Sequence, residues 1–505
     1  MTPDMSIQEW RVMMRKSRIT VHKRHVKHIV AFLLTFLLFI TVIPVRVDAG
    51  THIPENVYMS VDGHENALVR VVNVSYSNNM YISLRDTARL FADTGCPFNL
   101  DINGGAIAII TGERYDDGMS NTGWSFEELK QHPGADPGNN SLTVNGEDRR
   151  YFTLLLSVGD VYDGFISPMD LAMILDVDFV IDDSDNITVN TSAGFDINPA
   201  RMESDGFFDG LNTVVVGDAT TGEIFYGYDM ETAYPIASTT KLMTYLLTMD
   251  AISSGAISEN DMVIISEEAA RLSNSQDGAV AMESGWNIPV SELILGALLP
   301  SSNECALSLA ECVGGTEEAF VEMMNNKAEE LGMTTAKFFN SNGLPIYTDE
   351  VIAAKTQNKM SGLDMFRMCS HIINTYPQVK DITSLKTARM ETLKRDLKNT
   401  NGLLYNMPEV NGLKTGTTDR SGACLISSLT VQGADGPHDI IVVVLGAENS
   451  QSRIRYSELM ARYAKNVIEG EAAKISYSVN DSDDEGEITS ESIVRLVVDY
   501  ALKNK

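Results

Sequence analysis

The hydrophobic pattern of roughly the first 200 residues repeats itself. The stretch 81–88 shares its aromatic, Ile-Ser, Asp and Ala positions with the stretch 165–172, and strand-like runs follow each of them, at 98–109 and at 179–189. A short helical stretch followed by two such runs predicts one helix packed on a small hairpin in each copy. Neither unit could bury much surface alone. We therefore expect residues 50–198 to form one small α+β repeat domain.

A different pattern, in which long helical stretches separate the strands, covers residues 205–470. Apolar runs at 214–216 and 223–226 flank a turn and predict a hairpin. Strands from both ends of this region, with helices between them, predict one α/β sheet and an additional helical subdomain. The expected later strands are 423–431 and 439–445, and the expected helices are 238–252, 289–299, 304–313, 317–331 and 453–468.

The N-terminus combines basic residues with an uncharged apolar run. Seven Lys or Arg residues precede position 28, and the run extends from Ile29 to Val45, ahead of the small residues Ala49 and Gly50. This order is typical of a cleaved secretory signal peptide. An uncleaved membrane anchor is the alternative, because a run of this length can just span a bilayer. In both cases residues 1–49 direct export.

The C-terminal residues 471–505 differ in composition from the region before them. The segment 481–487 is strongly acidic, and 493–502 could form one short helix. We expect an acidic tail in which this helix packs locally.

Composition and charge narrow the class of function. Of the 505 residues, 44% are hydrophobic and 7% aromatic, which is ordinary for folded domains. The formal net charge of −30 disfavours a nucleic-acid partner, because phosphate backbones need a basic surface. The five cysteines do not suggest a disulfide framework, and no Cys or His cluster has zinc spacing. We therefore expect neither a metal nor another cofactor.

Three short motifs carry the candidate chemistry. A serine is a poor nucleophile until a neighbouring base takes its proton. On a helix that begins at Ser238, Lys241 lies one turn away on the same face, and burial would lower its pKa enough for it to act as that base. The motifs also supply a second hydroxyl, an amide and a cation, which suits acyl transfer to serine. They are Ser238-Thr239-Thr240-Lys241, Ser301-Ser302-Asn303 and Lys414-Thr415-Gly416.

Each motif alone has an ordinary structural explanation. Ser-x-x-Lys occurs by chance about once in a few hundred residues of average composition. Ser302 or Asn303 could simply cap the helix that follows, and Lys414 could be an exposed lysine at a turn. The order and spacing of all three motifs weaken these explanations.

With their flanking residues, the motifs resemble the D-alanyl-D-alanine carboxypeptidases, which are low-molecular-mass penicillin-binding proteins of peptidase family S11. The resemblance implies a β-lactamase/transpeptidase-like fold, in which helices flank an antiparallel sheet beside a helical subdomain. It covers about residues 207–468 and includes Pro235–Thr244, Asn326–Ala328, Leu331–Met333, Phe339–Asn340, Asn342–Leu344, Gly412–Thr418 and Val443–Ala447.

The resemblance implies a catalytic role for Ser238, Lys241 and Ser301, and it places Lys414 in the substrate-binding set. Ser238 would be acylated by the penultimate D-alanine carbonyl of a peptidoglycan stem peptide, and Lys241 would accept its proton. Ser301, helped by Lys414, would pass a proton to the leaving D-alanine. Water would release the acyl-enzyme, whereas β-lactam antibiotics would trap it.

The resemblance also implies a substrate-binding set. Asn303 would bind the substrate amide, and Gly416 would let the substrate approach the strand edge closely. Thr415 and Thr417 would hold the region of the terminal carboxylate. The backbone N–H groups of Ser238 and Thr417 would form the oxyanion hole.

The chain departs from this family in three places. The middle motif continues as Glu304-Cys305, where the family usually has Asp-Ala, and the stretch 345–365 matches poorly. No counterpart of the β-rich C-terminal domain of many relatives is evident. The repeat domain resembles the stalk domain first described in copper amine oxidases, so we expect it to act as a spacer or to contact the cell wall.

Two other functions stay open at this stage. A class A β-lactamase shares the three motifs but needs a glutamate on a separate loop to activate water, and the stretch 338–344 contains no acid. A wall-binding protein with a silent catalytic domain would keep the same fold. The sequence alone distinguishes neither a vegetative from a sporulation role nor one stem peptide from another.

Overall fold

The computed structural model describes residues 57–470, with gaps at 65, 75–78, 104–105, 116–140, 159–160, 183, 205, 276–277 and 346–355. The predicted signal or anchor and the predicted C-terminal tail lie outside the described residues. Among the helices of the described part, none is both long and apolar enough to cross a bilayer. The described residues all fall within one unit, 51–505, so the proposed boundary between the repeat domain and the region after it stays a prediction.

Residues 57–190 contain the two copies of the repeat. Helices α3 (Leu84–Phe91) and α5 (Pro168–Leu175) begin at equivalent positions, directly after Ser83 and Ser167. An antiparallel hairpin follows each helix, β5–β6 in the first copy and β11–β12 in the second. The helix and hairpin predicted for each copy are therefore present, which confirms the small α+β repeat class.

Pairing with other strands extends these hairpins into larger sheets. In the described part of the chain the strand orders are β11-β12-β1-β2, β5-β6-β7-β8 and β3-β4-β10-β9. Ile82 of β4 lies opposite Ile166 of β10, its equivalent in the repeat, so the two copies meet about a local two-fold axis. The strands are β1 (Val57–Val61), β2 (Ala67–Val69), β3 (Val71–Val74), β4 (Asn79–Ser83), β5 (Phe98–Asn103), β6 (Ala106–Thr111), β7 (Ser141–Val144), β8 (Glu147–Arg149), β9 (Thr153–Val158), β10 (Val161–Ile166), β11 (Asp178–Ile181) and β12 (Ile187–Asn190).

Strands from both ends of the region 205–470 form one sheet, as predicted. Among the described residues its order is β14-β13-β23-β22-β21, and every neighbouring pair is antiparallel. The predicted class, an antiparallel sheet flanked by helices with a helical subdomain, is confirmed. The strands are β13 (Thr213–Asp218), β14 (Ile224–Tyr228), β21 (Val410–Thr418), β22 (Gly422–Gly433) and β23 (Gly436–Ala447).

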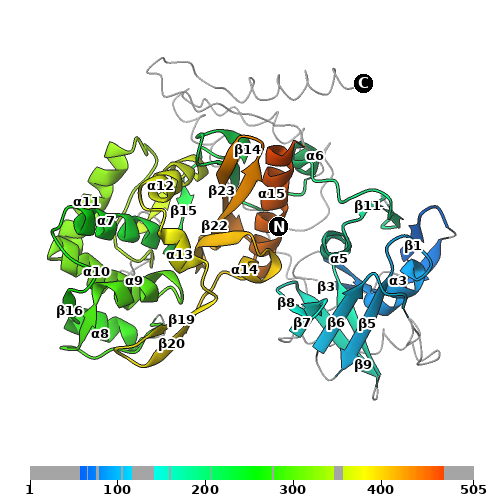
Figure 1. Ribbon diagram of the computed structural model, residues 1–505, viewed down its shortest axis with the longest axis horizontal. Helices are drawn as coiled ribbons and strands as arrows, with labels where there is room; N and C mark the ends of the chain where they lie inside the picture. Colours follow the sequence, from blue (N-terminus) through cyan, green and yellow to red (C-terminus); the bar gives the residue numbers. More distant parts are fainter. Residues whose placement is uncertain are drawn as a thin grey trace, which may run out of the picture. The chain divides into compact units, whose positions relative to one another are not determined.

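Both faces of this sheet are covered, which explains why its strands are apolar throughout. Side chains alternate between the faces of a strand, so Val442 and Val444 join one core cluster and Val443 joins the other. Helix α15 (Ser450–Glu469) packs on the first face and α12 (Gly362–Thr375) on the second (Figure 1). Because β21 is the edge strand, its outer side is available to line a site.

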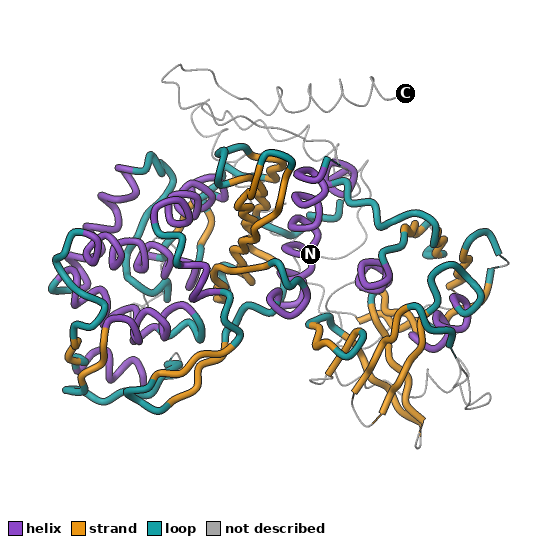
Figure 2. The backbone as a smooth tube through the Cα atoms, in the orientation of Figure 1, coloured by secondary structure: helices purple, strands orange, loops and turns teal. Residues whose placement is uncertain are grey.

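The chain between β14 and β21 supplies the helical subdomain, which Figure 2 shows as a group of purple helices beside the orange sheet. Its main helices are α7 (Lys241–Ser253), α8 (Glu267–Ser273), α9 (Val290–Leu298), α10 (Asn303–Gly314) and α11 (Glu317–Glu330). Its shorter elements are α13 (Val379–Thr383), α14 (Leu403–Asn406), the pair β15 (Tyr234–Pro235) and β18 (Lys359–Met360), the hairpin β16 (Met262–Ile264) and β17 (Asn287–Pro289), and the hairpin β19 (Thr387–Met390) and β20 (Arg395–Lys398). The short helix α6 (Pro199–Ser204) lies outside this subdomain, before β13.

Side-chain caps mark half of the α-helix starts in the described part of the chain. Ser302, Thr316 and Asn449 each accept a backbone N–H of the first turn of the helix that follows. The predicted helix at 238–252 begins later than expected. Its first residues form a 3₁₀ turn, η1 (Ala237–Thr240), and α7 begins at Lys241.

His438 joins two carboxylates at one end of the main sheet. Its Nδ1 lies 2.8 Å from Asp218 Oδ2 and its Nε2 lies 2.7 Å from Asp435 Oδ1. Both ring nitrogens can donate only in the imidazolium form. These hydrogen bonds, first to Asp218 and then to Asp435, raise the pKa of His438.

The His438 cluster should stabilise the fold more at low pH than at high pH. Because the pKa is raised in the folded state, the contribution is fully present below the unfolded histidine pKa of about 6.5 and is lost as pH rises through the folded value. His438→Gln should therefore lower the unfolding temperature more at pH 5.5 than at pH 9. His371→Gln, which removes a histidine from α12, is the control. An equal loss at both pH values would contradict the prediction.

Candidate active site

The first motif lies on the tight turn between β15 and α7. Ala237 has a φ of +47°, a left-handed backbone conformation that residues other than glycine rarely adopt. The next residue, Ser238, is half-buried, and its turn continues directly into α7. The turn therefore presents the Ser238 hydroxyl at the N-terminal end of a buried helix, where backbone N–H groups point towards incoming negative charge.

Lys241 is completely buried beneath this hydroxyl. Its Nζ lies 2.8 Å from Ser238 Oγ, 2.8 Å from Asn303 Oδ1 and 2.8 Å from the Asn342 carbonyl oxygen. The last two groups are acceptors, so a neutral amine that donates its two hydrogens to them has its lone pair left for the Ser238 hydroxyl hydrogen. Burial lowers the pKa of Lys241 to about 7, so the neutral amine is populated near neutral pH.

The second motif divides between structure and chemistry. Ser302 caps α10, because its Oγ accepts the Cys305 N–H at 3.0 Å, so the ordinary explanation holds for this residue. Asn303, the first residue of α10, directs its Oδ1 at Lys241. Ser301 has a φ of +68° and is half-buried, and this local strain is typical of residues that a site holds in place.

The third motif lies on the edge strand β21, opposite the nucleophile turn. Lys414 is buried rather than exposed at a turn, and its Nζ donates to the Thr415 carbonyl at 3.0 Å. Burial, followed by the charges of Lys241 and Arg453, holds the pKa of Lys414 well below its ordinary value. A Cβ on Gly416 would lie 3.0 Å from both Ile236 O and Ser238 N. Glycine therefore lets β21 approach the backbone of the nucleophile itself, as well as any substrate.

Thr400 contributes to the site although its sequence context gave no sign of it. Its hydroxyl lies 2.6 Å from the Thr415 hydroxyl and also donates to the Leu299 carbonyl at 3.3 Å. The Thr400 backbone N–H bonds the same carbonyl. Thr400 thus fixes the Thr415 hydroxyl relative to the chain that leads into Ser301.

Arg453 is a second residue that the motifs did not reveal. From the first turns of α15, its Nη1 donates to the Gly416 carbonyl at 3.2 Å and to Thr417 Oγ1 at 2.9 Å. A basic residue so near a helix N-terminus opposes the helix dipole. An arginine in this unfavourable position is the one feature of the sequence that could have indicated a binding partner outside the helix. Thr417 itself is exposed at the mouth of the site.

The segment 338–344 forms the floor beneath the nucleophile turn. Asn358 Nδ2 donates to the Asn340 carbonyl at 2.9 Å and to Thr240 Oγ1 at 3.0 Å, which ties the segment to the start of α7. Gly343 packs against the nucleophile turn, because a Cβ there would lie only 1.9 Å from the Ala237 carbonyl oxygen. These contacts hold the Asn342 carbonyl in place beside Lys241.

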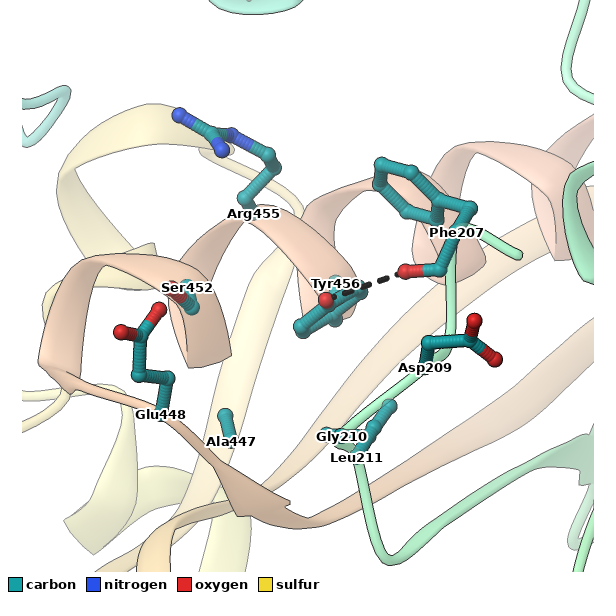
Figure 3. A pocket seen from close by; sticks show the side chains of 9 residues that line it. All are labelled: Phe207, Asp209, Gly210, Leu211, Ala447, Glu448, Ser452, Arg455 and Tyr456. Atoms are coloured by element: carbon teal, nitrogen blue, oxygen red, sulfur yellow. Dashed lines mark hydrogen bonds between the residues drawn. The ribbon is translucent and has the colours of Figure 1, made fainter. Parts of the chain in front are cut away.

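A separate hollow of about 380 Å³ lies where α15 begins, and Figure 3 shows its lining. Tyr456 donates its hydroxyl to the Phe207 carbonyl there at 3.2 Å, and Arg455, on its rim, pairs with Asp170 at 2.7 Å. None of the predicted site residues lines this hollow. Within the described part of the chain, no group of three or more His, Cys, Asp or Glu side chains is placed to hold a metal ion.

Gly343→Ala should disable the site without touching a motif residue. Its φ of +90° is unfavourable for alanine, and the added Cβ would collide with Ala237 and displace Ser238. A displacement of about 1 Å can cost on the order of 100-fold in rate. We expect a loss of that size in the labelling of Ser238 by a fluorescent penicillin. Gly332→Ala is the control, because Gly332 has a φ of +68° but nothing within 4 Å of its Cβ position. Labelling of the Gly343 variant at the wild-type rate would contradict this account.

Curated proteins with similar sequences match the same half of the chain. D-alanyl-D-alanine carboxypeptidase DacF of Bacillus subtilis is 34% identical over 244 residues, which are 48% of this chain and 58% of that protein. DacD of Escherichia coli is 30% identical over 255 residues, 50% of this chain and 62% of that protein. The chain therefore spans less than two thirds of the length of these relatives.

A solved structure from Streptococcus pneumoniae, a peptidoglycan synthesis regulatory factor (PBP3), is 31% identical. It aligns over 50% of this chain and 73% of that one, with a TM-score of 0.46. The sequence model of the D-alanyl-D-alanine carboxypeptidase family, peptidase S11, matches residues 211–449, which include all three motifs. Residues 211–449 of this chain therefore belong to the peptidase S11 family of D-alanyl-D-alanine carboxypeptidases.

Proposed function

We propose that this protein is a serine-type D-Ala-D-Ala carboxypeptidase that removes the terminal D-alanine from peptidoglycan stem peptides. The observation that carries the proposal is the contact of 2.8 Å between Lys241 Nζ and Ser238 Oγ, inside a pocket that lowers the pKa of the lysine. Membership of the S11 family supports the choice of substrate.

In the acylation step, Ser238 Oγ attacks the carbonyl of the penultimate D-alanine while its proton moves to Lys241 Nζ. The negative charge that develops on the carbonyl oxygen faces the backbone N–H groups of Ser238 and Thr417. The close approach at Gly416 supports this assignment, because it brings β21 beside the Ser238 backbone. Preorganised donors of this kind stabilise the transition state strongly.

The leaving group needs a proton and a place for its carboxylate. Ser301 relays the proton that Lys241 took up to the D-alanine nitrogen as the C–N bond breaks, with help from the buried Lys414, and Lys241 is left neutral for the next step. Thr415 and Thr417 bind the terminal carboxylate, and their contacts with Thr400 and Arg453 support this role. Asn303 holds Lys241 through its Oδ1 and binds the substrate amide.

Water then hydrolyses the ester on Ser238, and Lys241 again accepts the proton. A β-lactam presents a comparable carbonyl and carboxylate, so it acylates the same serine. No step requires a metal or another cofactor. The motif residues are intact, which favours this function over a silent wall-binding domain.

The substrate places this activity outside the cytoplasm. The basic and apolar pattern of residues 1–49 supports export, and the repeat domain is proposed to space the catalytic region from the membrane or to contact the wall. Its two repeat copies carry no counterpart of the three catalytic motifs in the sequence.

Incubation with a fluorescent penicillin should give a covalent adduct on Ser238, because the penicillin carbonyl occupies the position of the substrate carbonyl. Ser238→Ala should abolish the adduct, whereas Ser254→Ala, at the other end of α7, should leave it unchanged. Mass spectrometry of a pentapeptide stem should show loss of one D-alanine with the wild type alone. Well-folded wild-type protein that neither labels nor releases D-alanine would refute the proposal, and rapid turnover of penicillin would point to a β-lactamase.

The acylation rate should rise with pH around a midpoint near 7, because Lys241 accepts the proton only when neutral and burial lowers its pKa to about 7. Lys241→Ala should slow acylation by several orders of magnitude while the protein stays folded. Stopped-flow measurement of penicillin acylation from pH 5 to 9 tests both points. A rate that does not depend on pH in this range, or unchanged acylation of the variant, would remove Lys241 from the role of base.

A further inference from the structure

We propose that Glu304 is a positioning residue that anchors the backbone of Ala279 and Val280 to α10 and supplies negative charge near Lys241. This inference deepens the proposed function and rests on it. Glu304 directly follows the second motif and is the acidic residue at the position where the family usually has aspartate.

The anchor is a pair of hydrogen bonds to one buried oxygen. Glu304 is completely buried, and its Oε1 accepts the backbone N–H of Ala279 at 2.9 Å and that of Val280. Backbone N–H groups left unpaired in the interior are costly, and Val280 is itself fully buried. Ala279 and Val280 lie in the loop between α8 and β17, where no neighbouring strand pairs with their N–H groups. The carboxylate of Glu304 therefore satisfies these two donors.

The side-chain length matters for this anchor. Helix α10 packs tightly here, since a Cβ on Gly296 of α9 would lie 2.5 Å from Cys305 Sγ. The position of Glu304 on the helix is thereby fixed, and the bonds to Ala279 and Val280 must be reached by the side chain alone. An aspartate is one methylene shorter, so on this backbone it would not reach both donors.

The same carboxylate lies close to the base along α10, because Glu304 directly follows Asn303, whose Oδ1 lies 2.8 Å from Lys241 Nζ. Burial is the main cause that lowers the pKa of Lys241, and the charge of Glu304 is the principal influence that raises it again. The other groups that face Lys241 come from several elements. They are the neutral partners Ser238, Asn303 and Asn342, the thiol of Cys305, whose pKa burial raises, and the cation Lys414 on β21, with Arg453 of α15 behind it.

In this arrangement Glu304 is the acidic group near two buried lysines, Lys241 and Lys414, whose pKa values burial lowers. Without the charge of Glu304, the pKa of Lys241 would be lower. The amine would then be neutral at lower pH, but it would be a weaker base, because base strength falls with the pKa. The carboxylate thus keeps the pKa of Lys241 close to the pH at which the enzyme would work. The two hydrogen bonds from Ala279 and Val280 hold the carboxylate in the position where it has this effect.

The test compares variants that separate charge from anchoring. Glu304→Gln removes the charge, while its amide oxygen can still accept both N–H groups. Its acylation by a fluorescent penicillin, measured from pH 5 to 9, should have a midpoint about one pH unit or more below that of the wild type. Glu311→Gln, the same change further along α10, should leave the midpoint in place. A uniform loss of rate with no change of midpoint would reduce Glu304 to a structural residue and overturn the electrostatic part.

Anchoring has its own readout, amide hydrogen exchange of the peptide that contains Ala279 and Val280. Exchange there should accelerate at least tenfold in Glu304→Ala and in Glu304→Asp, and remain slow in Glu304→Gln. Unchanged protection in the shortened variants would overturn the anchoring part. Glu304→Asp keeps the charge and should keep the midpoint near 7, so it tests the proposal even where the alanine variant does not fold. If the wild type labels normally and the midpoint of Glu304→Gln is not shifted, the electrostatic part of this inference is rejected and the proposed function is not. If the wild type does not label, the proposed function itself is rejected.

Discussion

One buried amine organises the catalytic half of this protein. Lys241 has no contact with solvent, and its three partners come from three different parts of the chain: the nucleophile turn, the start of α10 and the segment 338–344. An unpaired ammonium in such a place would be very costly. The fold surrounds the amine with two carbonyl acceptors, one hydroxyl and a nearby carboxylate. With these partners the lysine can gain and lose its proton near neutral pH without destabilising the core.

The geometry around this amine depends on positions where the backbone is constrained. Ala237 and Ser301 have positive φ angles, and Gly343 and Gly416 lie where a side chain would collide with the nucleophile turn. Strain of this kind costs of order 1–3 kcal/mol at each residue. It persists because the sheet next to it is buried on both faces and holds β21 against the turn. The rigidity of the sheet is therefore what allows the serine to be presented in an unfavourable local conformation.

The sequence predicted those parts of this structure that depend on local pattern. Helices α9, α10 and α11 lie within one or two residues of their expected bounds, because their hydrophobic pattern is local and the Ser302 cap of α10 is visible in the sequence. The order of the three motifs indicated which segments meet at the site. The start of α7 was misplaced, since the choice between a 3₁₀ turn and an α-helix at Ser238 is made by the packing of Gly343 and Gly416 against that turn.

Contacts that join distant segments could not be predicted in this way. Thr400 and Arg453 reach the edge strand β21 from a turn and from helix α15, and no local pattern indicates which strand edge they contact. The same is true of Glu304, whose partners lie 24 and 25 residues earlier. In the repeat domain the hairpins were visible as alternating runs, but their extension into larger sheets depends on pairing between strands far apart, such as β1 with β12. Register between distant strands is fixed only by the assembled core.

The distribution of charge explains how an acidic protein could hold the anionic ligand proposed for it. The chain has a formal net charge of −30, yet Lys241, Lys414 and Arg453 are all buried around the site. Exposed charges more than about 8 Å away are largely screened at physiological salt, whereas charges in a low-dielectric pocket are not. The carboxylate of the proposed stem peptide would therefore experience mainly the groups buried nearby, among which the guanidinium of Arg453 stays charged even when Lys241 is neutral. The surface charge then governs solubility and the approach of ligands, and the pocket governs which ligand stays.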